Sequence, residues 1–312
     1  MLRANKSLVL VKLEETYGVD PSPVKGSNAF IATNVKVDMI TKMVERLGIH
    51  QSGGKYPPII IGEGVKVTFE TELYPAASAN AVPYVDPLLQ ACGMIKSGGT
   101  STPVVYTQGL ALGSEKSCTI HIYIDTILHS VTGCIGNMKM TSTVNELTKL
   151  SFEFTGLYSS PTASSTPLDA TFPALTPLML KAAALTYDTV ALVGTTVDID
   201  LGNSIQKRDS WNDTDGVAAY YISEQECTGS IDPEADAPDS FSIWEKILSS
   251  DVAALSLTLE GGARDVTVAL ESCYATAAPY ADRNNILTWN LSFASRVALN
   301  DASYAPLVLT FT

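Results

Sequence analysis

The chain has 312 residues, of which 46% are hydrophobic and 17% are charged. Charged residues are fewer than the roughly 25% of a typical soluble protein, and the apolar content is enough for a sizeable core, so disorder and a coiled coil are excluded. The 20 basic and 33 acidic residues give a net charge of −13. This charge argues against tight binding of nucleic-acid phosphates, which depends on Lys and Arg, but it is compatible with a wall along which nucleic acid slides.

Strands dominate the expected secondary structure. Apolar and polar residues alternate with a period of two, as in antiparallel strands with one face on a core, over 35–38, 65–72, 118–125, 149–154, 197–200, 255–260 and 287–293. The Gly-, Ser- and Thr-rich stretch 95–116 predicts a long loop or hairpin. Short helices are expected over 87–92 and over 241–248, the second with Asp239 and Ser240 as candidate N-caps.

The sequence also resembles itself. Residues 33–39 match 195–201 at an offset of 162, which also pairs Arg46 with Arg208. Further along, 120–124 match 255–259 and 131–135 match 266–270 at an offset of 135, and 150–154 match 287–291 at 137. We therefore expect a duplicated unit, with 27 extra residues between positions 72 and 120 of the first copy.

A run rich in Ser, Thr and Pro, residues 159–177, lies between the two copies and is typical of a linker. The prediction is a mainly β protein with two tandem β-sandwich or barrel domains, residues 1–158 and 178–312, each with one short helix. Cut at residue 170, the first part has 13 basic and 14 acidic residues, and the second has 7 and 19. The acidity is thus local to the second copy.

The cysteines and the apolar segments indicate the compartment. The five cysteines contain no CxxC pair, which predicts buried, reduced thiols: Cys92, Cys118, Cys134, Cys227 and Cys273. Lys12 interrupts the N-terminal apolar run, so we expect no signal peptide. No stretch approaches the roughly 18 apolar residues of a membrane span. A protein made in a cytoplasm, without membrane insertion, is expected.

Residues that carry chemistry are sparse. The densest group of potential metal ligands lies on 118–134 and includes His121 and Asp125, but the alternation there makes these two the polar face of a strand. The glycine pairs at 53–54 and 98–99 lack the spacing of a phosphate-binding loop. No nucleophile elbow or framed carboxylate pair is present. We expect no enzymatic activity, no metal and no cofactor.

One acidic run has three interpretations. Residues 224–239 hold six carboxylates and no basic residue. A calcium site is one interpretation, although the EF-hand spacing is absent. A solvated acidic surface is the simplest, and the border of a channel that does not retain DNA is the third.

Three phrases in the sequence resemble the tail tube proteins of long-tailed bacteriophages. They are LVLVKLEETYGVDPSP at 8–23, PLLQACG at 87–93 and KLSFEFTGLY at 149–158, in the order of that family. The resemblance implies a structural virion protein of the tail, assembled in the host bacterial cytoplasm. Its β-sandwich-like subunits would form stacked rings around a channel, commonly negative, through which DNA passes during ejection without sequence-specific binding. The expected partners are further copies of the chain and the tape-measure, terminator and baseplate or tip proteins.

In some proteins of that family two tandem copies occur, and three chains then make a pseudo-sixfold ring, which suits the duplication here. We assign the lumen to acids that match between the copies: Asp38, Glu70, Glu72, Asp200, Asp232 and Glu234. We assign ring-to-ring contacts to two segments that join paired strands, with Met43, Val44, Glu45, Arg46, Leu47, Lys207, Arg208 and Trp211. The plain alternatives are outer surface for the acids and ordinary hairpin tips for the segments.

Other functions remain open at this point. A tail terminator, or the inner tube of a contractile injection device, would share the fold. A carbohydrate-binding or adhesive β-sandwich pair would need an exposed aromatic platform, and the sequence offers three tryptophans, Trp211, Trp244 and Trp289. A hydrolase comes last, because the sequence contains no recognisable catalytic group.

Overall fold

The structure is a computed structural model that describes residues 3, 6–48, 50–109, 115–181, 183–213, 215–237, 242–249, 252–262, 264–296 and 305–312. Strands make up 53% of it and helices 5%, which confirms the mainly β prediction. The candidate caps Asp239 and Ser240 lie outside the described residues.

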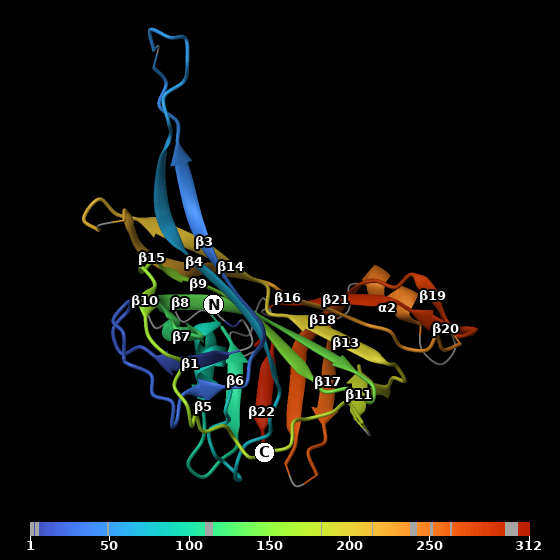
Figure 1. Cartoon of the computed structure of the whole chain (residues 1–312). Coiled ribbons are helices and arrows are strands. Elements are labelled where there is room, and N and C mark those ends of the chain that lie inside the picture. Colours follow the sequence, from blue (N-terminus) through green and yellow to red (C-terminus); the bar gives the residue numbers. More distant parts are fainter. Residues whose placement is uncertain are drawn as a thin grey trace.

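Each half contains strands and one short helix (Figure 1). The first half comprises β1 (Ser7–Leu13), β2 (Ala29–Phe30), β3 (Thr33–Val44), β4 (Ile59–Glu72), α1 (Asp86–Ala91), β5 (Met94–Ser97), β6 (Val104–Gln108), β7 (Cys118–Ile124), β8 (Ile127–Thr143), β9 (Lys149–Leu157) and β10 (Thr162–Ala163). The second comprises β11 (Ala184–Tyr187), β12 (Val190–Ala191), β13 (Thr196–Asp200), β14 (Asn203–Asp209), β15 (Val217–Gln225), β16 (Cys227–Ile231), α2 (Ile243–Ser249), β17 (Ala253–Leu259), β18 (Val266–Ala277), β19 (Tyr280–Arg283), β20 (Ile286–Trp289), β21 (Leu291–Ser295) and β22 (Val308–Phe311).

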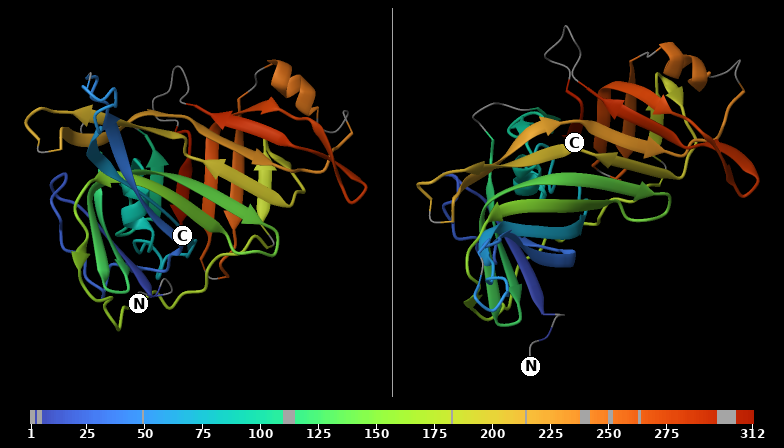
Figure 2. Two further views of the ribbon diagram at one scale, coloured as in Figure 1. Left: turned by 45° about the horizontal axis from the view of Figure 1, so that its top comes forward. Right: turned by 90° about the horizontal axis from the view of Figure 1, so that it is seen from above.

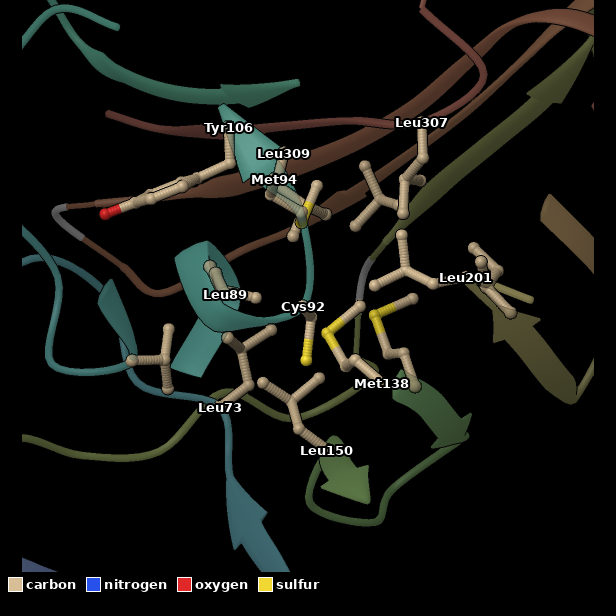
Figure 3. Close-up of a cluster of buried hydrophobic side chains, with 14 of the residues drawn as sticks. Leu73, Leu89, Cys92, Met94, Tyr106, Met138, Leu150, Leu201, Leu307 and Leu309 are labelled. Carbon is tan, nitrogen blue, oxygen red and sulfur yellow. The ribbon is translucent and has the colours of Figure 1, made fainter. Parts of the chain in front are cut away.

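One antiparallel sheet runs through both halves in the order β3–β4–β9–β8–β13–β16–β21–β18, and we call it the main sheet. Figure 2 shows β8 and β9 of the first half (green) beside the strands of the second half (yellow). On the core side of this sheet, α1 contacts β1, β5, β7 and β8. The hydrophobic core there is shared, since Cys92, Met138 and Leu150 lie near Leu201 and Leu307 (Figure 3). The halves are therefore joined by both backbone pairing and packing.

The order of strand pairing in the first half recurs in the second. The first half pairs β1–β7–β8–β9–β4–β3, and the second pairs β11–β17–β18–β21–β16–β13. A short helix precedes β7 in one and β17 in the other. The ladder registers also correspond, because Val67 lies opposite Phe154 as Gly229 lies opposite Phe293.

These registers correct part of the sequence self-alignment. Cys118 lies opposite Cys134, and Ala253 opposite Cys273, so β7 and β17 correspond at an offset of 135 (253 − 118) but β8 and β18 at 139 (273 − 134). The matches at 135 for residues 131–135 and at 137 for residues 150–154 were wrong by four and by two. Both errors are even numbers, because a period-two pattern matches itself at every even shift. The longer turn between β17 and β18 accounts for the change from 135 to 139.

Two hairpins extend beyond the packed strands. Arm 1 is β3–β4 with its loop 45–58, and it stands away from the body in Figure 1. Arm 2 is β14–β15 with its loop 210–216, and it packs against β8 and β9. The stretch 95–116, expected as a loop or hairpin, contains the hairpin β5–β6, while residues 110–114 lie outside the described part.

The run 159–177 is held against the first half. β10 pairs with β8, the Ser164 amide donates to the Thr126 carbonyl at 2.9 Å, and the Thr171 amide donates to that of Lys25 at 3.0 Å. The division into domains 1–158 and 178–312 with a linker between them stays a prediction.

Candidate functional site

The main sheet has a polar face opposite the core. Along β4, Val65, Val67 and Phe69 are buried, and the residues between them alternate outward. A groove on this side is lined by side chains from both halves, including Lys139 and Asp200. The polar face consists of Lys36, Asp38, Lys66, Thr68, Glu70, Glu72, Lys149, Ser151, Glu153, Thr155, Asn137, Lys139, Thr141, Thr143, Thr196, Asp198, Asp200, Thr228, Ser230 and Ser292.

Four of the six acids assigned to the lumen lie together on the polar face. They are Asp38, Glu70, Glu72 and Asp200. Three of them face a lysine on a neighbouring strand: the register places Asp38 opposite Lys66, Glu72 opposite Lys149 and Asp200 opposite Lys139. Opposite charges in such positions stabilise a sheet by a few tenths of a kcal/mol up to about 1 kcal/mol.

The polar face is close to electrically balanced. It holds six carboxylates against four lysines, and Lys66 Nζ lies 2.6 Å from Glu153 Oε1. Two further carboxylates accept hydrogen bonds from neutral side chains: Asn137 Nδ2 donates to Asp200 and Thr141 Oγ1 donates to Asp198, each at 2.7 Å. The sequence reasoning missed these lysines, although the alternation that selected the acids places the lysines on the same face.

Asp232 and Glu234 are held by Arg283 instead of standing free. The Arg283 guanidinium donates to Asp232 Oδ2 at 3.0 Å and to Glu234 Oε1 at 2.9 Å. Asp232 also accepts hydrogen bonds from the amides of Thr195 and Thr196, at 2.7 and 2.6 Å. Burial opposes ionisation of Asp232, but these hydrogen bonds outweigh it and lower its pKa. The group fastens the β19–β20 hairpin to the start of β13.

On arm 1, the residues assigned to ring contacts are largely exposed. Leu47 is 94% exposed and Met43 is 61% exposed, and Val44 is also on the surface. Arg46 lies over the Tyr56 ring, 5.3 Å from its centroid. Glu45, Arg46, Leu47 and Tyr56 border a shallow hollow in the loop, whereas Met43 and Val44 do not line it.

On arm 2, the assigned residues have different surroundings. Lys207 lies inside β14 and makes ion pairs with Glu63 at 2.7 Å and Asp209 at 2.9 Å, which raise its pKa. Arg208 is the next residue of the same strand. Trp211, in the loop, is 96% exposed. The base of arm 2 is thus attached to the first half through Lys207, whereas Trp211 at its tip is exposed.

Sequence reasoning missed a buried acid in the phrase at 8–23. Glu14 is 6% exposed, and its carboxylate accepts four hydrogen bonds. The donors are Thr119 Oγ1 at 2.6 Å and the Gly133 amide at 2.7 Å on one oxygen, and Ser117 Oγ at 2.6 Å and the Gly18 amide at 2.8 Å on the other. Because it binds β7, β8 and the chain after β1, Glu14 fixes this corner of the fold. The only sequence signal was its place in the phrase.

Tyr17, three residues further on, connects the same corner to arm 2. Its hydroxyl donates to the Gly133 carbonyl at 3.1 Å and accepts from the Tyr220 amide at 2.7 Å. Burial raises the pKa of Tyr17 to about 12. The Tyr220 hydroxyl in turn donates to the Glu63 carbonyl at 3.1 Å. The phrase therefore contributes to the attachment of arm 2.

The candidate metal ligands do not form a site. In the part of the chain that the structure describes, no three His, Cys, Asp or Glu side chains are grouped to hold a metal ion. His121, expected on the polar face of its strand, has a polar partner but is covered: it is 8% exposed, and its Nε2 lies 2.8 Å from Asp20 Oδ2 in the chain after β1. In the acidic run, Glu226 makes an ion pair with Arg296.

Other predicted features are placed as follows. All five cysteines are buried and free, as expected for structural thiols. Trp289 is 2% exposed, whereas Trp211 and Trp244 lie on the surface of different elements, the loop of arm 2 and α2. The described helices are too short to cross a membrane.

Comparison with known proteins identifies the family. A search of curated proteins found no match. The model of the phage tail tube protein family matches residues 4–304, which is nearly the whole chain. This agrees with the resemblance of the three phrases and with the mainly β fold. The chain therefore belongs to the phage tail tube protein family, whose members are structural components of the virion tail.

Proposed function

We propose that this chain is the major tail tube subunit, which assembles with itself into stacked rings around a channel for DNA passage during ejection. The observation that carries the proposal is the main sheet, which buries one face and leaves the other polar and open across both halves. A sheet with free edges must be covered, paired or closed into a ring to avoid uncontrolled aggregation. Ring closure with the polar face inward satisfies this requirement and forms a hydrated wall.

The recurrent pairing order supports two tandem units, residues 1–158 and 178–312. Each chain would supply two neighbouring sixths of a ring, so that three chains make a pseudo-sixfold ring. The contact between successive chains is then heterologous, and a 60° step between units closes it. The β8–β13 pairing inside one chain is the covalently tethered version of the same step.

The composition of the polar face suits a channel through which DNA slides. Its net charge is slightly negative, and Ser and Thr side chains surround the charged pairs. Lysines that are already paired with carboxylates offer little to a phosphate backbone, whose binding depends on the release of counterions by free cations. Such a wall attracts DNA weakly and carries no pattern that reads a sequence.

We place ring-to-ring contacts at the tips of the two arms. Leu47 and Trp211 are almost fully exposed and supply apolar area, while Glu45 and Arg46 supply charge. Exposed ion pairs contribute about 0–1 kcal/mol, so the apolar side chains must provide most of the binding energy. Other proposed contacts at the ends of the tube are with the tape-measure, terminator and baseplate or tip proteins.

Electron microscopy of the purified protein tests the assignment. Negative-stain images are expected to show hollow rings of three chains that stack into tubes. Rings that never stack would identify a terminator instead. A protein that stays monomeric at high concentration, also with the other particle components added, would refute the tube assignment.

Charge reversal on the polar face tests the channel. Replacing Glu70 and Glu72 by Lys removes two negative charges and adds two positive ones, so the net charge of each chain rises by four. Particles with the double variant are expected to keep intact tubes but to eject DNA more slowly, because free cations bind phosphate. Reversal of the exposed Glu15, which lies outside the polar face, is the control. Ejection at the native rate from Glu70→Lys/Glu72→Lys particles would contradict the orientation of the sheet.

A further inference from the structure

Among the described strands, β3 at one end of the main sheet has a free edge, and so does β19 in the hairpin that follows β18 at the other end. In the described residues, β3 pairs only with β4 over its twelve residues. At the other end, β18 leads into β19, which pairs only with β20. Inside the chain, the corresponding strands do meet, since β13 pairs with β8 through five residues, Thr196 to Asp200 opposite Thr143 to Lys139.

The internal pairing fixes a register for the free edges. β3 corresponds to β13 at an offset of 162, so Val37 takes the place of Ile199 and Lys36 that of Asp198. The residue of β19 that corresponds to Met140 is found from the strand beside it. Met140 lies opposite Leu150, Trp289 is the counterpart of Leu150, and Tyr280 lies opposite Trp289, so Tyr280 corresponds to Met140. Ile199 lies opposite Met140 and Asp198 opposite Thr141. Val37 would therefore lie opposite Tyr280, and Lys36 opposite Ala281.

The backbone of β19 is oriented to accept this strand. The Asn290 amide donates to the Pro279 carbonyl at 2.9 Å, so the polar groups of Pro279 point inward to the neighbouring strand. In an antiparallel ladder the next residue points the opposite way, which directs the amide and carbonyl of Tyr280 to the free edge. The missing amide hydrogen of Pro279 thus costs the new edge nothing.

Side-chain burial supports the same docking. On the second half, Leu201 is 0% exposed and Ile222 is 3% exposed, because the strand after β13 and arm 2 pack against the first half. Their counterparts at an offset of 162, Met39 and Ile60, are 52% and 63% exposed. Arm 1 therefore presents apolar side chains at the positions where arm 2 buries them.

The receiving surface shows the complementary difference. Met140, at the edge that β13 covers, is 1% exposed, and its counterpart Tyr280 is 57% exposed. Beside Tyr280 lie Trp244 of α2, with ring centroids 6.1 Å apart, and Leu287 of β20, which is 56% exposed. Contiguous apolar surface of this kind marks an interaction site.

From these observations we propose that β3 of a second copy of this chain extends the main sheet at β19, with Lys36 opposite Ala281. In the same contact, arm 1 of that copy covers the apolar surface formed by Trp244, Tyr280 and Leu287. The proposal rests on the ring assembly proposed above and assigns its chain-to-chain interface. Met43, which lies opposite Ile60 in arm 1, then belongs to the contact within a ring.

Disulfide cross-linking tests the register. The Leu201 amide donates to the Met138 carbonyl, so Leu201 and Met138 form a hydrogen-bonded pair of the antiparallel ladder. Such pairs alternate with non-hydrogen-bonded pairs, and Asp198 and Thr141 are one of the latter. The Cα atoms of such a pair lie about 4.5 Å apart, which is within disulfide range. The variant Lys36→Cys/Ala281→Cys, oxidised after assembly, is expected to give covalent dimers and trimers and no larger species on a non-reducing gel. The buried native cysteines keep the background low.

Two matched variants serve as controls. Thr141→Cys/Asp198→Cys, the corresponding pair inside the chain, is expected to cross-link without forming multimers. Lys42→Cys/Ala281→Cys moves the first cysteine six residues along β3, about 20 Å, and is expected to give no covalent multimer. Tubes in the microscope with no covalent multimer from Lys36→Cys/Ala281→Cys would overturn the register while leaving the tube assignment intact. Absence of any ring or tube from the native chain would overturn both.

A third variant tests the arm. Ile60→Asp is expected to prevent assembly while leaving the unfolding free energy of the monomer nearly unchanged, because Ile60 is exposed before assembly. Ile222→Asp is expected to destabilise the monomer itself. Normal tube formation by Ile60→Asp would overturn the placement of arm 1.

Discussion

Replacing Glu14 by alanine removes a carboxylate that accepts hydrogen bonds from four donors on three segments of the chain. Two donors are hydroxyls, which rotate toward other acceptors. The other two are the amides of Gly18 and Gly133, which are fixed by the backbone. An unsatisfied buried donor costs about 1–3 kcal/mol, so the two amides alone account for about 2–6 kcal/mol. We expect Glu14→Ala to lower the free energy of unfolding by about 4 kcal/mol, a large part of the 5–15 kcal/mol typical of folded proteins.

Urea unfolding followed by tryptophan fluorescence measures this loss. Glu14→Gln is expected to lose about half as much, because the amide keeps one oxygen acceptor but turns an NH2 group toward the other pair of donors. Glu15→Ala is the control, since Glu15 is exposed, and should change stability by less than about 0.5 kcal/mol. A loss below about 1 kcal/mol in Glu14→Ala, or equal losses in Glu14→Ala and Glu15→Ala, would refute the stabilising role of this network.

Three further predictions follow from the same reasoning. Tyr17→Phe leaves the Tyr220 amide without its acceptor and should cost about 1–3 kcal/mol, with faster hydrogen exchange confined to arm 2 and its neighbours. Asp232→Asn should lower the free energy of unfolding at neutral pH by about 1–3 kcal/mol. Because the pKa of Asp232 is lowered in the folded state, its carboxylate stabilises the fold above the usual Asp pKa, and this stabilisation is lost as the pH falls through the folded pKa. The difference in unfolding free energy between the native protein and the variant, measured by urea titration, should therefore shrink below about pH 4. Gly229→Ala should destabilise by more than about 2 kcal/mol in thermal unfolding, because its Cβ would lie 2.4 Å from the Asp198 carbonyl oxygen and 2.4 Å from the Phe293 ring, and an unchanged melting temperature would show that the strands move apart easily.

The sequence predicted the strands well because alternation reports directly which side of a strand is buried. It predicted most of β9 and the part of β4 from residue 65 onward, but it missed residues 59–64 of β4. The same pattern placed Asp38, Glu70 and Asp200 on one face. A period-two pattern looks the same after any shift by an even number of residues, however, so it could not distinguish such alignments. The alignment of β9 with β21 was therefore wrong by two residues. Only the pairing registers distinguish such shifts.

Contacts between distant segments were beyond reach for a different reason. Arg283 neutralises Asp232 and Glu234 across about fifty residues, and nothing in the local pattern of any of them indicates that contact. Alternation placed His121 on the polar face of its strand, but it did not indicate that residues after β1, including Asp20, cover that face. The alternation within one strand distinguishes the two faces of that strand, but it does not indicate which other segments pack on them.

The buried cysteines have a consequence for how long the assembled protein lasts. Burial raises the pKa of Cys92, Cys118 and Cys227 well above the usual range, and that of Cys273 to about 12. Oxidation and thiol exchange proceed through the thiolate, which is scarce at neutral pH when the pKa is this high. Cys118 and Cys134 lie opposite each other on β7 and β8 yet remain free. The thiols of a tail built from this chain are therefore expected to resist oxidation and disulfide exchange in air without a reducing agent.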